Sequence, residues 1–129
     1  MDIVDVLKNM PDYIGADGAT EEEISQSEKI LGIKFFEDYR EYLKEVGVAC
    51  FDGHELTGLC KNIRLNVVNV TIEERKNNPD IPFDWYVVEQ ANIDGIVIWQ
   101  NQNGEIYESQ PSAKSVKISD TMVEYIIKE

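Results

Sequence analysis

The side chains best suited to nucleophilic or metal chemistry are the single histidine, His54, and two cysteines, Cys50 and Cys60. Their spacing lacks the paired ligands of a structural zinc site. A nucleophile and base formed by Cys50 and His54 would need both side chains on one face of the expected hairpin, where they are diagonal, and nothing nearby orients the imidazole. We therefore predict neither a metal site nor cysteine catalysis.

Carboxylate chemistry is harder to exclude because the chain has 25 acidic residues. That number produces chance pairs, such as Glu105 with Glu108. Pro79-Asp80 is similar to the start of a nuclease metal motif, but the Glu74-x-Lys76 pair that would complete it lies upstream. Glycine-rich phosphate-binding loops are absent. We predict a non-enzymatic protein without a cofactor, and a small carboxylate hydrolase stays as a third hypothesis.

Binding is the function that the remaining pattern favours. Aromatic residues rimmed by charge are typical of interface hot spots, and this chain places both on neighbouring predicted strands. The candidate partner-binding residues are Asp84, Glu89, Asp94, Trp99, Glu105, Tyr107 and Glu108. If Ile96 and Ile98 face the core, alternation turns Trp99 outward. The alternative, that Trp99 packs in the core, stays open.

The net charge of −13 restricts the class of partner. Phosphate backbones are anionic, so we expect no nucleic-acid binding, and a cationic partner is favoured. Acidity that serves solubility alone is the alternative. No apolar run is long enough to span a membrane, and residues 1–10 do not look like a secretory signal. We expect a cytoplasmic protein without membrane contact, either a monomer or a weak homodimer.

Helix signals dominate the first part of the chain. Residues 1–10 predict a short helix with Ile3, Val6, Leu7 and Met10 on its apolar stripe, followed by a loop over 11–19. Two further helices then follow in succession. The first begins at a capping box of Thr20 with Glu23 and ends at Gly32, and the second runs from Phe36 or Glu37 to Gly47.

A β-hairpin is predicted where Asp52-Gly53 separates two β-prone segments. Its register places Phe51 opposite His54 and Cys50 opposite Glu55, which leaves Cys60 beyond the partner strand. The two cysteines are therefore expected to stay reduced and unpaired with each other.

The rest of the chain predicts a helix from Val67 to Lys76 and then a β-meander. Its strands are residues 85–90, 95–100 and 105–109, separated by glycine turns. A closing helix begins at Ser119 or Asp120 and packs on the sheet. The sequence thus predicts one α+β domain over residues 1–129, with an antiparallel meander packed against N-terminal helices and a C-terminal helix.

One motif in the helical part resembles the signature of the SUKH superfamily, the cell-wall assembly regulator-like and toxin-immunity proteins. The matching residues are Glu28, Leu31-Gly32, Phe35, Asp38-Tyr39, Tyr42-Leu43 and Gly47. Phe36 replaces the usual proline and Val46 the frequent asparagine. The proline is a helix-start device that other residues can replace, so the fold is expected to persist.

The resemblance implies an immunity protein that binds and neutralises a toxin encoded beside it, and many such toxins are nucleases. A nuclease carries a basic cleft for phosphate, which an acidic protein complements without chemistry of its own. The first hypothesis is therefore an antitoxin whose partner is a basic nuclease domain. The second is a regulatory or scaffolding adaptor that binds another cellular protein.

Overall fold

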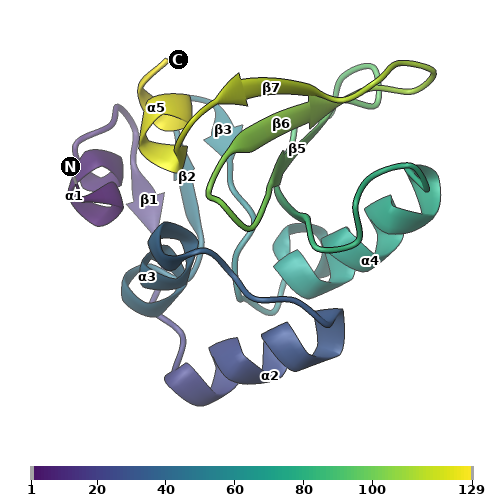
Figure 1. Cartoon of the computed structure of the whole chain (residues 1–129). Helices are drawn as coiled ribbons and strands as arrows, with labels where there is room; N and C mark the ends of the chain where they lie inside the picture. Colours follow the sequence, from purple (N-terminus) through teal and green to yellow (C-terminus); the bar gives the residue numbers. More distant parts are fainter. Residues whose placement is uncertain (1, 129) are drawn as a thin grey trace.

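The computed structural model describes residues 2–128, which form the predicted α+β fold (Figure 1). The helices are α1 (Ile3–Lys8), α2 (Glu21–Leu31), α3 (Glu37–Glu45), the short 3-10 helix η1 (Ile63–Leu65), α4 (Val67–Asn77) and α5 (Met122–Ile127). The strands are β1 (Ile14–Gly15), β2 (Ala49–Phe51), β3 (His54–Glu55), β4 (Tyr86–Gln90), β5 (Val97–Gln100), β6 (Ile106–Ser109) and β7 (Val116–Ser119).

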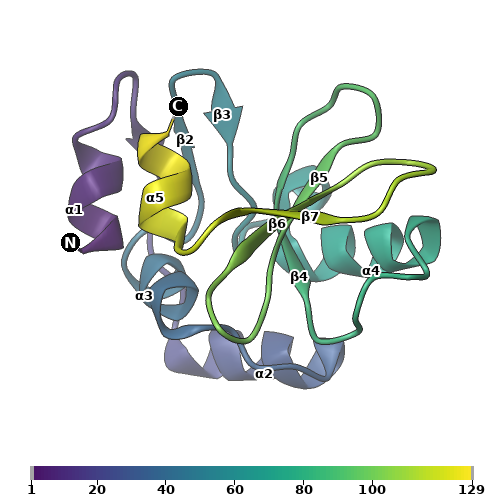
Figure 2. The same ribbon diagram turned by 45° about the horizontal axis from the view of Figure 1, so that its top comes forward.

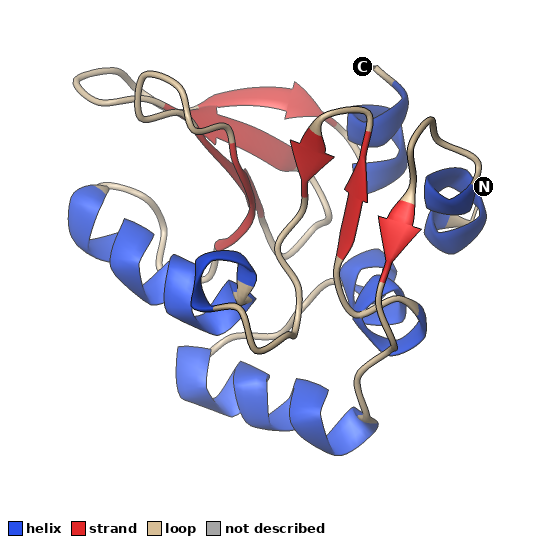
Figure 3. Cartoon of the chain, turned by 180° about the vertical axis from the view of Figure 1, so that it is seen from behind, coloured by secondary structure: helices blue, strands red, loops and turns tan. Residues whose placement is uncertain are grey.

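The strands form two antiparallel sheets, one in the order β1-β2-β3 and the other β4-β5-β6-β7. The two sheets stand side by side when the molecule is seen from behind (Figure 3). An isolated antiparallel bridge between Leu56 and Glu89 connects them. The predicted meander is confirmed, and it continues into β7 at the edge of its sheet.

Helix α2 begins and ends where the sequence predicts. The Thr20 hydroxyl accepts from the Glu23 amide at 3.1 Å, and the Glu23 carboxylate accepts from the Thr20 amide at 2.9 Å. Both halves of the capping box are therefore present. At the other end Gly32 has a φ of 72°, a left-handed conformation that favours glycine.

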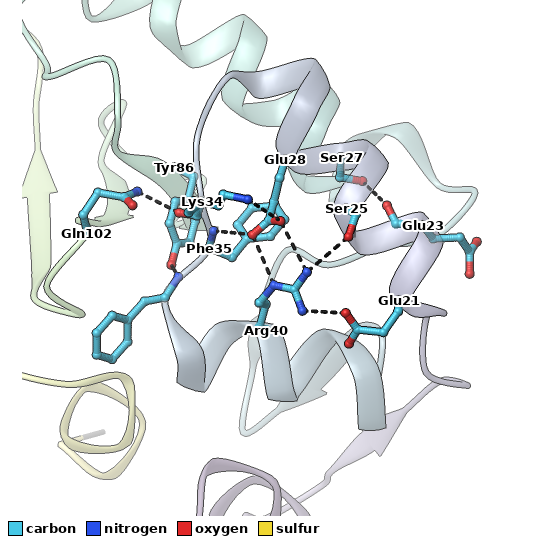
Figure 4. Close-up of polar contacts among 11 residues, drawn as sticks. Glu21, Glu23, Ser25, Ser27, Glu28, Lys34, Phe35, Arg40, Tyr86 and Gln102 are labelled. Atoms are coloured by element: carbon cyan, nitrogen blue, oxygen red, sulfur yellow. Dashed lines mark hydrogen bonds and ion pairs between the residues drawn. The ribbon is translucent and has the colours of Figure 1, made fainter.

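The turn between α2 and α3 is built around the buried carboxylate of Glu28 (Figure 4). One Glu28 oxygen accepts from the Phe35 amide at 2.9 Å and from Arg40 Nε at 3.2 Å. Arg40 also reaches Glu21 at 2.8 Å and Ser25 at 3.3 Å. Because these three α2 residues share one helix face, a single α3 side chain fixes α3 against α2.

A second polar chain attaches the start of α3 to the meander. The Phe36 amide donates to the Tyr86 hydroxyl at 2.9 Å, and that hydroxyl donates to the Gln100 amide oxygen at 2.5 Å. The Gln100 nitrogen donates to Asp38 at 3.1 Å. Burial raises the pKa of the Asp38 carboxyl, although the bond from Gln100 opposes the shift. Tyr86 thus satisfies an amide that proline would lack.

The hairpin has the predicted register, with Phe51 opposite His54 and Cys50 opposite Glu55. Asp52 and Gly53 have φ values of 44° and 81°, as a two-residue hairpin turn requires. Cys50 and Cys60 are both free and half-buried.

The meander is covered on both faces, which corrects the expected exposure of Trp99. Its alternation is as predicted: Ile98 joins the large core shared with α2 and α3, and Trp99 points the other way. That second face is buried too, because α4 packs along β4 and contributes Val70 to a smaller apolar cluster around Trp99. Trp99 is 0% exposed, and its Nε1 donates to Ser109.

Several expected boundaries were wrong. The predicted loop over 11–19 contains β1, which pairs with β2, and residues 116–119 form β7. The closing helix is capped by Thr121, whose hydroxyl accepts from the Glu124 amide, and so starts later than Ser119 or Asp120. Met1, the first residue of the predicted N-terminal helix, and Glu129 lie outside the described residues.

The helix boundaries of α2 can be tested by substitution. Thr20→Ala is expected to lower the free energy of unfolding by about 1 kcal/mol because an amide loses its cap. Gly32→Val should cost considerably more, since φ is positive there and a Cβ would lie 3.3 Å from the Phe83 ring. Urea denaturation measures both, with Thr20→Ser as the control that keeps the cap. An unchanged midpoint for Gly32→Val would contradict this account.

The Glu28 turn gives a second test. Glu28→Ala removes an Arg40 partner and also leaves the buried Phe35 amide without its acceptor, so it should destabilise by about 2 to 3 kcal/mol. Glu21→Ala is the matched control, because it removes an Arg40 partner whose side chain is 59% exposed, and its cost should stay below about 1 kcal/mol. Equal urea midpoints for the two variants would show that the buried contact does not position α3.

Candidate functional site

The histidine and the cysteines do not form a reactive site. His54 Nδ1 lies 2.9 Å from a Glu89 oxygen, and the other Glu89 oxygen accepts from the Tyr125 hydroxyl. Glu89 is 4% exposed, so this carboxylate ties β3, β4 and α5 together beneath the surface. Its expected role in direct partner binding is therefore corrected, because a buried carboxylate is hidden from a partner.

The remaining candidates for chemistry are poorly suited to it. Burial, followed by the nearby Glu55 carboxylate, raises the pKa of the Cys50 thiol and so disfavours its nucleophilic thiolate form. Glu74 accepts from Gln90 at 2.6 Å. This carboxylate therefore has a structural role in joining α4 to β4, rather than a joint chemical role with Asp80. Among residues 2–128 no group of acidic, histidine or cysteine side chains has a geometry that could hold a metal ion.

The other predicted meander residues reach the surface but do not form one patch. Asp84 and Asp94 are exposed on separate loops on either side of β4. Tyr107 is half-buried with its ring centroid 4.3 Å from that of Trp85, and neighbouring Glu108 points to the opposite face of β6. Glu105 is neutralised by Lys117, whose Nζ lies 3.0 Å away.

A cleft of about 550 Å³ lies near this part of the sheet. It is formed by the loop after α4, residues 77–81, and the segment from β6 to β7, residues 109–115. Its charged lining residues are Asp80 and Lys114, which balance each other. The cleft therefore has no net charge with which to select an ionic partner.

A stronger electrostatic feature lies where α1 packs against α3. The sequence pattern did not predict this feature. Asp2 and Asp5 come from α1 and its cap, and Glu41 and Glu45 from α3. Partial desolvation, followed by repulsion from the Asp2, Glu45 and Asp5 carboxylates, raises the pKa of Glu41. None of the four forms an ion pair with another residue in the range 2–128. Negative charge is thus concentrated here without an ion-pair partner among the described residues.

An apolar hollow adjoins these carboxylates. It has a volume of about 500 Å³ and is lined by Asp2, Asp5, Val6, Asn9 and Met10. The sequence assigned Val6 and Met10 to the inner stripe of α1, but the buried residues are Ile3, Val4 and Leu7. Val6 and Met10 are half-buried at the edge of that stripe. The residues that line the hollow recur in the sequence at helical intervals of three and four. This pattern is the sequence signal that could have identified the hollow.

The comparisons with known proteins agree with this fold. No helix within residues 2–128 combines the length and apolar character needed to cross a membrane. A search of curated proteins finds no match. The SUKH_5 family model, described as SMI1-KNR4 cell-wall, matches residues 1–127, nearly the whole sequence. The motif at the α2–α3 turn and this match together show that the chain belongs to the SUKH family.

Proposed function

We propose that this protein is a cytoplasmic immunity protein that binds a cognate toxin, a basic nuclease domain, and neutralises it by protein-protein contact. The observation that carries the proposal is the net charge of −13 in a SUKH chain, with clustered carboxylates on α1 and α3 that have no ion pair within residues 2–128. A nuclease needs cations around its phosphate cleft. An acidic surface that covers the cleft blocks its substrate and requires no catalytic group of its own.

The acidic residues also bear on how such a complex forms. Long-range attraction between opposite charges speeds association, whereas apolar and aromatic anchors slow dissociation. We assign the first role to the exposed Asp84 and Asp94 and to the half-buried Glu105 and Glu108, with a smaller contribution from Glu105 because it pairs with Lys117. The second role falls to Tyr107 among the predicted meander residues, because Trp99 is in the core.

A second candidate function is a regulatory or scaffolding adaptor. The observation that favours it is the description of the matching family, which refers to the cell wall. The same acidic surface would then bind a basic region of another cellular protein. The two functions differ in the partner, so the gene beside this one distinguishes them: a toxin with a basic C-terminal domain supports the immunity function.

Binding kinetics against the toxin domain encoded beside this protein test the proposal. Association should slow as salt rises beyond about 0.1 M, where the Debye length is near 10 Å. Combined Asp94→Lys and Glu108→Lys substitutions should reduce the association rate several-fold, with a smaller effect on dissociation. Tyr107→Ala should instead mainly accelerate dissociation.

The control is a variant with Asp94→Asn and Glu108→Gln, which removes charge without reversing it and should have about half the effect on the logarithm of the association rate. Absence of binding at any salt concentration, with the protein folded, would contradict the immunity function. Binding that is insensitive to both salt and meander charge would place the contacts on another surface.

A further inference from the structure

We propose that the hollow on the outer side of α1 is the docking groove for a cationic amphipathic segment of the toxin. This inference rests on the proposed function and assigns it a surface, defined by Asp2, Asp5, Val6, Asn9 and Met10 with Glu41 and Glu45 beside them. Helix α1 lies at the edge of the molecule next to α5, where a partner has access (Figures 1 and 2).

The geometry of α1 creates the groove. Ile3, Val4 and Leu7 face the core and hold the helix against its neighbours. Asp5 on the helix and the cap residues Asp2 and Asn9 are exposed on the outer side, and Val6 and Met10 are half-buried between the two sides. The result is a hollow of about 500 Å³ with an apolar strip inside an acidic rim.

The negative charge around the groove indicates which kind of partner segment can bind there. Some acidic residues elsewhere on the surface have cationic partners, such as Glu21 with Arg40, Glu55 with Arg64, Glu73 with Lys76, and Glu105 with Lys117. The α1 and α3 carboxylates differ in that they lie close enough together to repel one another. The α1 and α3 carboxylates have no such partner among residues 2–128. Arg40 is the main cause of the lowered pKa of Glu21, and Lys44, adjacent to Glu45 in the sequence, contributes least to it, which places Lys44 near Glu21. Lysine or arginine from a partner is the complementary charge.

The apolar strip adds a shape requirement. Val6 and Met10 supply a site for one or two apolar side chains, and the flexible methionine can adapt to their shape. A segment that fits must therefore present apolar residues flanked by lysine or arginine, as one side of a basic amphipathic helix does. A metal ion does not fit the same residues, because no metal-binding geometry occurs within residues 2–128.

The probe for this groove is a short synthetic amphipathic peptide of lysine and leucine, titrated into the full-length protein and followed by backbone amide NMR. We expect chemical-shift changes to concentrate on α1 and on residues 41–45. A lysine-only peptide of equal charge should bind several-fold more weakly, because it leaves Val6 and Met10 uncovered. Chemical-shift changes distributed evenly over all acidic surfaces would overturn the proposal that the peptide binds in this groove.

Two variants of equal net charge sharpen the test. Asp5→Lys with Glu41→Lys reverses charge at the groove, and Glu22→Lys with Glu73→Lys makes the same change at exposed positions on α2 and α4. The first should weaken peptide binding about tenfold or more, and the second much less. Amide dispersion verifies that both fold, and Asp5→Asn with Glu41→Gln provides a milder groove variant. Equal weakening by the two reversed variants would overturn the proposal.

The toxin domain separates failure of the groove from failure of the function. If the wild-type protein binds the toxin and the two reversed variants bind it equally, the groove is wrong and the immunity function stands. If the wild-type protein does not bind the toxin, the proposed function itself is wrong. Selective loss of toxin binding in the groove variant supports both.

Discussion

The Glu28 carboxylate, buried between α2 and α3, is the contact on which the rest of the arrangement depends. A buried carboxylate is stable only when its oxygens are hydrogen-bonded or paired, and Glu28 has both kinds of partner, the Phe35 amide and the Arg40 guanidinium. These bonds fix the direction in which α3 leaves the turn. Tyr86 then attaches the start of α3 to β4, and α1 packs on α3. The position of the acidic surface therefore follows in part from the turn that orients α3.

Local signals explain what could be predicted from the sequence. The capping box at Thr20, the left-handed Gly32 and the turn at Asp52-Gly53 each depend on a few neighbouring residues, and the structure confirms all three. Trp99 shows the limit. Alternation correctly separated it from Ile98, but whether a sheet face is covered depends on α4, which is distant in the sequence. Strand β7 was missed because its alternation of apolar and polar residues is only four residues long, the shortest run that indicates a strand.

Only the acidic character of the candidate site could be predicted from the sequence. The acidic excess predicts a cationic partner, which stays a prediction, and the choice of meander residues assumed that charge next to aromatic rings in the sequence remains exposed and unpaired. The structure buries Glu89 against Tyr125 and neutralises Glu105 with Lys117. The Asp2 and Glu41 carboxylates meet only because α1 packs on α3. Such a meeting of two helices is tertiary information that neither segment contains.

The raised pKa of Glu41 links this packing to binding. A carboxyl whose folded-state pKa exceeds its unfolded value favours the folded state when protonated, and this contribution is lost as the pH rises through the folded pKa. At neutral pH the charged cluster therefore opposes the packing of α1 on α3. A cation from a partner would make this contribution favourable. It would stabilise the ionised carboxylates in the positions that the packing of α1 on α3 gives them. In the proposed complex, the repulsion among these carboxylates in the free protein would add to the free-energy difference that favours binding.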